Sequence, residues 1–132
     1  MSYTVLVVDD SSIVRAMVRK SLAMAGLEIK IIHEAGNGEE ALGVLRREWI
    51  DLVFADLNMP VMGGLELVQR MAADRLLETV PVVIVSSEHN QARIDELKRQ
   101  GARAYIKKPF RPEQFREVLG EVLAGLEGEP HG

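Results

Sequence analysis

Five short apolar runs are spread along the chain, and each is followed by a segment with the periodicity of a helix. The runs lie at 5–8, 29–32, 52–55, 82–85 and 104–106. Nearly continuous apolar runs of this length are typical of strands that are buried on both faces. Strands that alternate with helices form parallel sheets covered by helices on each side. The pattern therefore predicts an α/β fold with one parallel sheet of five strands.

The helical segments carry their own start and stop signals. Ser11 is the predicted N-cap of a helix over 11–25, and Gly26 is its predicted stop. Asn37 stands three residues before Glu40, which is the spacing of a capping box. The segment 90–100 has a thin apolar stripe, chiefly Ile94 and Leu97. Two fuller stripes run along the first and last helices, at Ile13, Val14, Met17, Val18 and Leu22, and at Phe115, Val118, Leu119, Val122, Leu123 and Leu126.

Composition serves mainly to exclude classes of protein. With 132 residues, 47% of them hydrophobic, the chain has room for one domain and one core. It contains no cysteine, so disulfides and thiolate chemistry are absent. No apolar stretch reaches the length of a membrane span, and the N-terminus moves straight into a strand pattern, so we expect a cytoplasmic protein with no membrane contact. A net charge of −4 argues against direct DNA binding.

Charged and hydroxyl side chains stand directly after several of the apolar runs. Asp9 and Asp10 follow the first run, Asp56 follows the third, Ser86 follows the fourth and Lys108 follows the fifth. The carboxyl ends of parallel strands meet at one edge of the sheet, where open α/β folds bind their ligands. Three acids and a lysine at that edge predict a metal-dependent phosphate site.

Four motifs give the chain a specific resemblance. They are Val5–Ser12, Asp56–Gly64, Val85–Glu88 and Tyr105–Phe110. In order and spacing they resemble the receiver domains of two-component response regulators, above all the single-domain, chemotaxis-type (CheY-like) members. The resemblance implies a flavodoxin-like, doubly wound (βα)5 fold with strand order 2-1-3-4-5. It also implies a receiver domain over 1–126, a flexible tail over 127–132 and no output domain.

The resemblance also implies a reaction. Asp56 is the expected phosphoacceptor, taking a phosphoryl group from a sensor histidine kinase or a histidine phosphotransfer protein. Asp9, Asp10, Asp56 and the backbone carbonyl of Asn58 are the expected ligands of Mg²⁺ or Mn²⁺, which prefer oxygen donors. The product would be an aspartyl-phosphate, which marks the chain as a phosphoprotein rather than an enzyme that turns over an external substrate.

Further roles follow from the same resemblance. Lys108 and Ser86 would contact the phosphoryl group, and a serine in place of the family's frequent threonine keeps the hydroxyl donor. Tyr105 would act with Ser86 as the switch, and Pro109 would follow a cis peptide bond. Asn58 and Glu88 would tune the phosphate lifetime. The signal would leave through a downstream protein bound at the surface formed by segments 90–100, 104–106 and 115–126.

Other readings of the same residues stay open. Paired acids after a strand are often a helix N-terminus complementing its dipole, and Asp56 before a proline loop is often turn chemistry. A Mg-dependent phosphohydrolase using Asp56 is an alternative, although such phosphatases generally need a second acid where this chain has Asn58. A phosphorylation-independent pseudo-receiver is a third possibility, and the complete set of acids argues against it.

Two positions add expectations of their own. The family usually has aspartate before the second glycine of the loop, whereas this chain has Gly63. Losing that aspartate removes an N-cap, so we expect a less stiff loop around Asn58 and a lower metal affinity. Trp49 is expected to close the end of the second helix against the edge of the sheet.

Overall fold

The structure is a computed structural model, and it describes residues 2–127. Its five parallel strands form one sheet in the order β2-β1-β3-β4-β5, which confirms the predicted topology. Strands and helices alternate along the chain as follows: β1 (Tyr3–Val8), α1 (Ser12–Met24), β2 (Ile29–Ala35), α2 (Gly38–Arg47), β3 (Leu52–Ala55), α3 (Gly64–Ala72), β4 (Val82–Ser86), α4 (Gln91–Gln100), β5 (Ala104–Lys107) and α5 (Pro112–Glu127).

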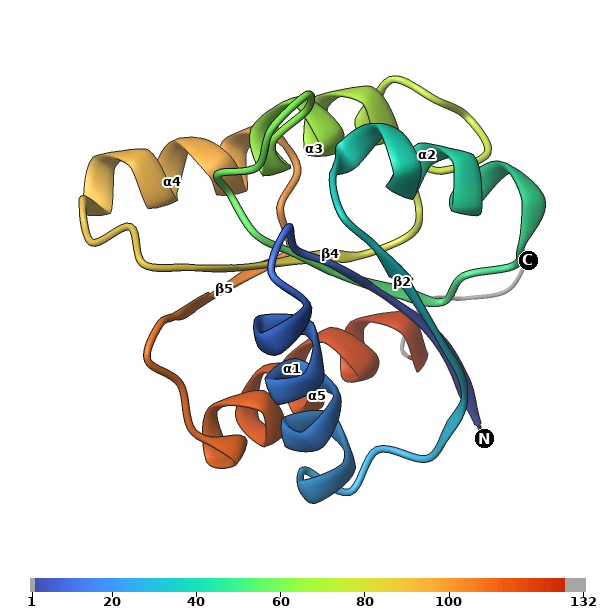
Figure 1. Cartoon of the computed structure of the whole chain (residues 1–132), viewed down its shortest axis with the longest axis vertical. Coiled ribbons are helices and arrows are strands. Elements are labelled where there is room, and N and C mark those ends of the chain that lie inside the picture. The colour runs from blue at the N-terminus through green and yellow to red at the C-terminus, as the bar shows by residue number, and fades with distance from the viewer. Residues whose placement is uncertain (1, 128–132) are drawn as a thin grey trace.

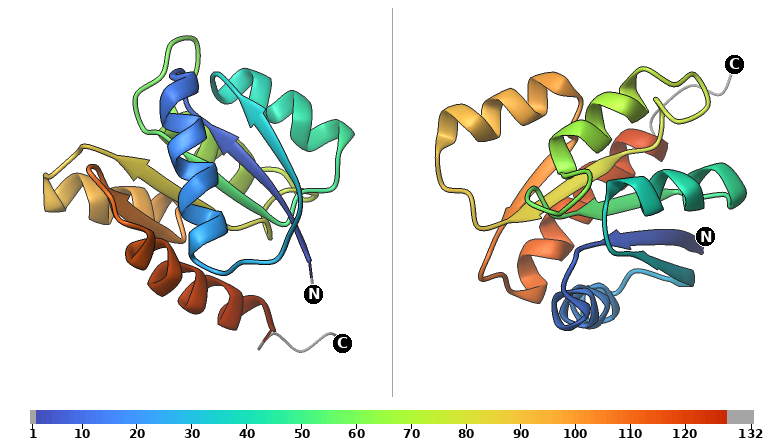
Figure 2. Two further views of the ribbon diagram at one scale, coloured as in Figure 1. Left: turned by 60° about the horizontal axis from the view of Figure 1, so that its bottom comes forward. Right: turned by 45° about the horizontal axis from the view of Figure 1, so that its top comes forward.

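Helices cover both faces of the sheet. Figure 1 shows α2, α3 and α4 on one side and α1 with α5 on the other, and the two turned views in Figure 2 agree. Each strand therefore sends alternate side chains into two separate cores. In β1, Leu6 and Val8 enter the core under α2, α3 and α4, whereas Val5 and Val7 enter the core under α1 and α5. This double burial is the reason that β1 reads as an unbroken apolar run.

The predicted helix caps at Ser11 and Asn37 are present, and Asn90 caps α4 as well. The side chains of Ser11, Asn37 and Asn90 accept hydrogen bonds from backbone N–H groups in the first turns of α1, α2 and α4. The Asn37 box is only half of the standard motif, because Glu40 accepts from the Asn37 side-chain amide instead of its backbone N–H. At α3, Gly63 stands in the cap position and offers no side-chain hydrogen bond, as predicted.

Two apolar residues of the first predicted stripe do not join the core. Val18 and Leu22 are buried, but Ile13 is 73% exposed and Met17 is 51% exposed. The expectation for Trp49 is wrong as well, since this side chain is 81% exposed and its indole N–H donates to Asp51 Oδ1 at 2.9 Å. A hydrogen-bonding partner in the adjacent loop holds the ring outside the sheet edge.

The remaining helices follow their predicted stripes. Ile94 and Leu97 are the buried residues of α4. Along α5, Phe115, Leu119 and Val122 are buried against the sheet. α5 continues to Glu127, one residue past the predicted boundary, and the rest of the predicted tail, 128–132, lies outside the described residues. None of the described helices has the length and apolar character needed to cross a membrane.

Candidate functional site

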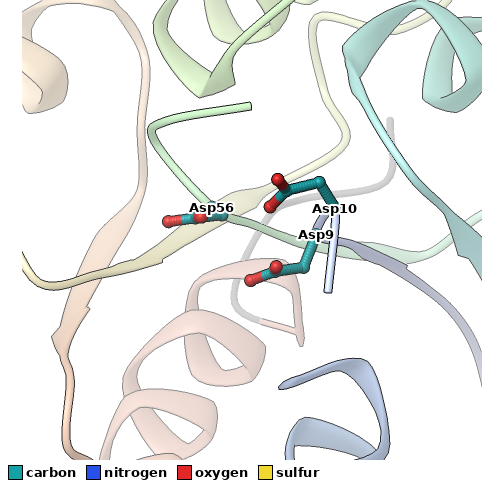
Figure 3. A group of neighbouring side chains, drawn as sticks. All are labelled: Asp9, Asp10 and Asp56. Carbon is teal, nitrogen blue, oxygen red and sulfur yellow. The ribbon is translucent and has the colours of Figure 1, made fainter. Parts of the chain in front are cut away.

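The strand order reverses between β1 and β3, and the acids lie at this point. β2 lies on one side of β1, and β3 with β4 and β5 lies on the other. Val8 pairs with Ala55, so the residues that follow them, Asp9 and Asp56, emerge side by side. Asp10 completes the group, and the three carboxylates each bring an oxygen within 4.8 Å of the others (Figure 3). Such a reversal is where doubly wound sheets bind ligands.

Asp9 is buried and is fixed by contacts of both its side chain and its backbone. It is 4% exposed. Its Oδ1 accepts the backbone N–H of Ser11 at 2.9 Å, and its Oδ2 lies 3.2 Å from Lys108 Nζ. Its own backbone N–H donates to the Ala35 carbonyl at 3.1 Å, which ties it to the end of β2. The carboxylate is therefore fixed in direction before any ligand arrives.

Asp56, directly after β3, is nearly buried as well, at 9% exposure. Burial raises the pKa of its carboxyl group above the usual range, and the nearby negative charge of Asp9 adds to the rise. The ammonium of Lys108, 3.6 Å from Oδ1, opposes the rise, as do hydrogen bonds from the Leu57 N–H and the Ser86 hydroxyl. Burial and Asp9 therefore destabilise the ionised form of Asp56, and Lys108 with the two hydrogen bonds offsets only part of this effect.

Lys108 supplies the only ammonium that bridges the acids in the described part of the chain. Its Nζ contacts both Asp9 and Asp56, while its backbone N–H donates to the Ser86 carbonyl at 2.8 Å. The peptide bond between Lys108 and Pro109 is cis. The neighbouring Lys107 is exposed. The structure therefore places Lys108, and not Lys107, at the acids.

Ser86 and Tyr105 lie on the neighbouring strands β4 and β5, and Ser86 contacts Asp56 through its hydroxyl. Ser86 ends β4 and is 1% exposed. Tyr105 pairs with Ile84 in the adjacent strand, and its hydroxyl donates to the Glu88 carbonyl at 2.9 Å. Burial raises the pKa of the Tyr105 hydroxyl, so it remains a donor. One hydrogen bond thus connects β5 to the loop that leads into α4.

The two residues expected to tune the phosphate lifetime occupy different places. Asn58 is exposed in the loop after Asp56. The Glu88 carboxylate accepts the backbone N–H of Asn90 at 2.9 Å and lies 3.7 Å from Arg93, so its side chain is engaged by the start of α4. The acids and Lys108 form one group, and Glu88 lies outside it, with its backbone carbonyl bound by the Tyr105 hydroxyl.

Arg15 is a site residue that sequence reasoning missed. Its Nη1 donates to the Asp9 carbonyl at 2.7 Å, and its Nε contacts Glu34 Oε1 at 2.8 Å. Arg19 contacts the other oxygen of Glu34 at 2.9 Å. These contacts tie α1 and β2 to the backbone of Asp9. A bond to a backbone carbonyl leaves no sequence pattern, so only the position of Arg15 one turn into the helix could have suggested it.

The donor set fits a hard divalent cation. Asp9, Asp10 and Asp56 offer carboxylate oxygens, which Mg²⁺ prefers, and they lie close enough together to share one ion. Three carboxylates face a single lysine, so the site carries excess negative charge that a divalent cation would neutralise. Asp10 is exposed, which leaves the group open to solvent on one side.

The fold and the site together define a class of protein: a doubly wound α/β domain with an acidic, lysine-bearing site at its switch point. Comparison with known proteins narrows this class. Residues 5–120 match the response regulator receiver domain family, so the chain belongs to that family.

Curated relatives and solved structures agree with this assignment. The chain is 37% identical to a chemotaxis protein CheY homolog of Campylobacter jejuni over 125 residues, which cover 94% of this chain and 95% of the relative. It is 35% identical to the chemotaxis protein CheY1 of Helicobacter pylori over 119 residues, 89% of this chain and 94% of that one. The structure of the chemotaxis response regulator CheY4 of Vibrio cholerae superimposes with a TM-score of 0.81 at 34% identity, covering 92% of this chain and 99% of that one.

Proposed function

We propose that this receiver domain is a phosphoacceptor switch, in which Asp56 takes a phosphoryl group from a histidine kinase or a histidine phosphotransfer protein. The observation that carries the proposal is the placement of Asp56. It is nearly buried, it lies beside two further acids at the switch point of the sheet, and it contacts Lys108. A structural acid at a helix start would not need a lysine reaching it from the opposite end of the sequence.

The proposed step is a phosphoryl transfer. A carboxylate oxygen of Asp56 forms a bond to the phosphorus as the phosphorus–nitrogen bond of the donor histidine breaks, and the electron pair stays with the departing imidazole. Bound Mg²⁺ would neutralise the charge shared by the carboxylate and the phosphoryl oxygens. Asp9, Asp10, Asp56 and the Asn58 carbonyl would hold it, while Lys108 would pair with a phosphoryl oxygen.

The output of the proposed switch is the surface of α4, β5 and α5. Ser86 would donate its hydroxyl to the phosphoryl group, and Tyr105 would follow the change through its bond to the Glu88 carbonyl. α4 is anchored by only two buried side chains, so little free energy is needed to move it. A downstream protein that prefers one arrangement of this surface would read the phosphorylation state.

The domain would signal by binding and would not turn over an external substrate. Position 58 holds Asn58, so the second acid expected of an aspartate-nucleophile phosphatase is missing. Asn58 and Glu88, on the two loops that border Asp56, would instead set how long the aspartyl-phosphate survives before water attacks it.

Mass spectrometry tests the acceptor directly. Incubation with acetyl phosphate and Mg²⁺ should add one phosphoryl mass to the wild-type protein and none to Asp56→Asn. Asp95→Asn, on the exposed side of α4, is the matched control and should be labelled like the wild type. Equal labelling of Asp56→Asn and wild type would remove Asp56 as the acceptor.

A further inference from the structure

Asp10 differs from the other two acids of the candidate site in how its side chain is held. The carboxylates of Asp9 and Asp56 are nearly buried, and each has hydrogen-bonding and ionic partners. The Asp10 carboxylate is exposed, and within residues 2–127 it has neither a hydrogen bond nor an ion pair. Figure 3 nevertheless shows it pointing to the same side as the Asp9 carboxylate. The direction of the Asp10 side chain is therefore set by its backbone.

That backbone is fixed on both sides of Asp10. Before it, the Asp9 carbonyl accepts a hydrogen bond from Arg15 Nη1 at 2.7 Å. After it, the Ser11 N–H donates to Asp9 Oδ1 at 2.9 Å. The Asp9 carbonyl and the Asp10 N–H belong to one planar peptide unit. A hydrogen bond that fixes this carbonyl therefore also fixes the plane from which the Asp10 side chain departs.

Arg15 can fix this peptide unit because its own guanidinium is held in place. It lies near the start of α1, and helical side chains lean toward the N-terminus of their helix, which brings the guanidinium back to Asp9. Its Nε contacts Glu34 Oε1 at 2.8 Å, while Arg19 contacts Glu34 Oε2 at 2.9 Å. The Arg15 side chain is 20% exposed, against 51% for Arg19. Arg15 is thus the inner arginine of the pair, fixed between β2 and the turn that carries Asp10.

The charge of Arg15 by itself works against a cation site. A guanidinium beside the acids repels Mg²⁺ and offsets part of their negative charge. Its hydrogen bond to the Asp9 carbonyl acts in the opposite direction, because it orients a ligand. The two effects have opposite signs in the metal affinity, so an experiment can separate them.

We propose that Arg15 is a positioning residue for Asp10, and this rests on the proposed function. By fixing the Asp9 carbonyl, Arg15 holds the Asp10 carboxylate where it can share one ion with Asp9 and Asp56. Mg²⁺ demands near-ideal octahedral geometry, so a ligand that is oriented in advance binds it more tightly. Residues that orient metal ligands from outside contribute about 10–100-fold in metal affinity. The gain from orientation therefore exceeds the loss from repulsion.

Methionine substitutions separate orientation from charge. Arg15→Met removes both the charge and the hydrogen bond to Asp9, and a dominant charge effect would make Mg²⁺ bind more tightly. We expect the opposite, a rise of about tenfold or more in the Kd for Mg²⁺ measured by calorimetry. Arg19→Met is the matched control, since it removes an equal charge from the same carboxylate of Glu34 but no bond to Asp9. Its Kd should stay at the wild-type value or slightly below it, because an exposed charge is screened.

A lysine at the same position tests whether the shape of the guanidinium matters. Arg15→Lys keeps the charge but lacks the planar fork that reaches Glu34 and Asp9 together. Its Kd for Mg²⁺ should also rise about tenfold, and it replaces Arg15→Met if that variant does not fold. Wild-type affinity in Arg15→Lys, or tighter binding in Arg15→Met, would overturn the inference.

NMR of the metal-free protein separates this inference from the proposed function. The amide nitrogen of Asp10 shares a peptide unit with the Asp9 carbonyl, so its resonance should move in both Arg15 variants and stay in place in Arg19→Met. An unmoved Asp10 resonance in both Arg15 variants would overturn the inference. Wild-type protein that takes up no Mg²⁺ would contradict the proposed function, while the Asp10 resonance would still decide whether Arg15 orients this peptide unit.

Discussion

The carboxyl group of Asp56 is harder to ionise than an exposed one, and this has a consequence for stability. Because its pKa is raised in the folded protein, the folded state holds this proton more tightly than the unfolded state does. The contribution of this group to the free energy of unfolding is fully present below its pKa in the unfolded chain, and it is lost as pH rises through its higher pKa in the folded protein. Ionisation of Asp56 therefore opposes folding.

Replacing Asp56 with asparagine should remove that opposition. We expect Asp56→Asn to raise the melting temperature of the metal-free protein at pH 7. The usual scale of a single substitution, about 1 kcal/mol, corresponds to roughly 3–6 °C for a domain of this size. The gain should shrink as pH falls and the wild-type carboxyl takes up its proton. Thermal unfolding of both proteins between pH 4 and 8 measures this, and a gain independent of pH would contradict it.

Lys108 should matter more than its neighbour on the strand. Lys108→Met leaves Asp9 and Asp56 close together without a counter-charge, so we expect a loss of about 1–2 kcal/mol in unfolding free energy. Lys107→Met, at an exposed position, should change stability by no more than about 0.5 kcal/mol. Urea unfolding of the two variants at pH 7 gives the comparison. Similar losses in both would show that Lys108 does not stabilise the acids.

The residues that sequence predicted best are those at strand ends. Asp9, Asp56 and Lys108 converge because parallel strands deliver their carboxyl ends to one edge, and this follows from the pattern alone. The partners of Arg15 did not follow, because one of them is a backbone carbonyl. Trp49 was misplaced because hydrophobicity predicts burial on average, whereas a single hydrogen bond to Asp51 can hold a ring in solvent.

At the scale of elements, α4 and α5 differ in how firmly the sheet holds them. α4 buries only Ile94 and Leu97, whereas α5 buries Phe115, Leu119 and Val122. The Phe115 ring also packs against the Phe54 ring, with the two ring centroids 5.5 Å apart. Local opening is less costly where fewer apolar side chains are buried. We expect amide hydrogens in α4 to exchange faster than those in α5, by about tenfold or more. Equal protection in the two helices, measured by NMR, would argue against α4 as the mobile element.

The positions of the helices along the chain could be predicted from the sequence. Which residues of each helix the sheet covers was harder to predict. The caps at Ser11 and Asn37 have a local chemical cause that is visible in the sequence. Periodicity shows which residues share a face but not how wide a strip the sheet covers. On α1 the covered strip excludes Ile13 and Met17, which the stripe had included. The strand order is a similar case, because residue patterns give a parallel sheet and the resemblance supplied the order.

For the whole molecule, the acidic site should couple metal binding to stability. Mg²⁺ held at the proposed site would have no comparable site in the unfolded chain, so added Mg²⁺ should raise the melting temperature. At Mg²⁺ concentrations near 100 times the Kd the gain is about 2.7 kcal/mol. Asp9→Asn, which removes a charge held at the centre of the site, should lose most of this gain. Calorimetric melts of both proteins with Mg²⁺ and with EDTA make the comparison, and equal gains would exclude Asp9 as a ligand.

The position of Trp49 determines which optical signals this protein can give. It is the only tryptophan of the sequence, and it lies between α2 and β3, at the edge of the sheet opposite the acids. Its ring is already 81% exposed in the folded state. Intrinsic fluorescence should therefore change little on metal addition, on phosphorylation or even on denaturation. The variant Leu57→Trp would place a tryptophan beside the proposed acceptor. Its fluorescence should then report metal binding and phosphorylation at Asp56.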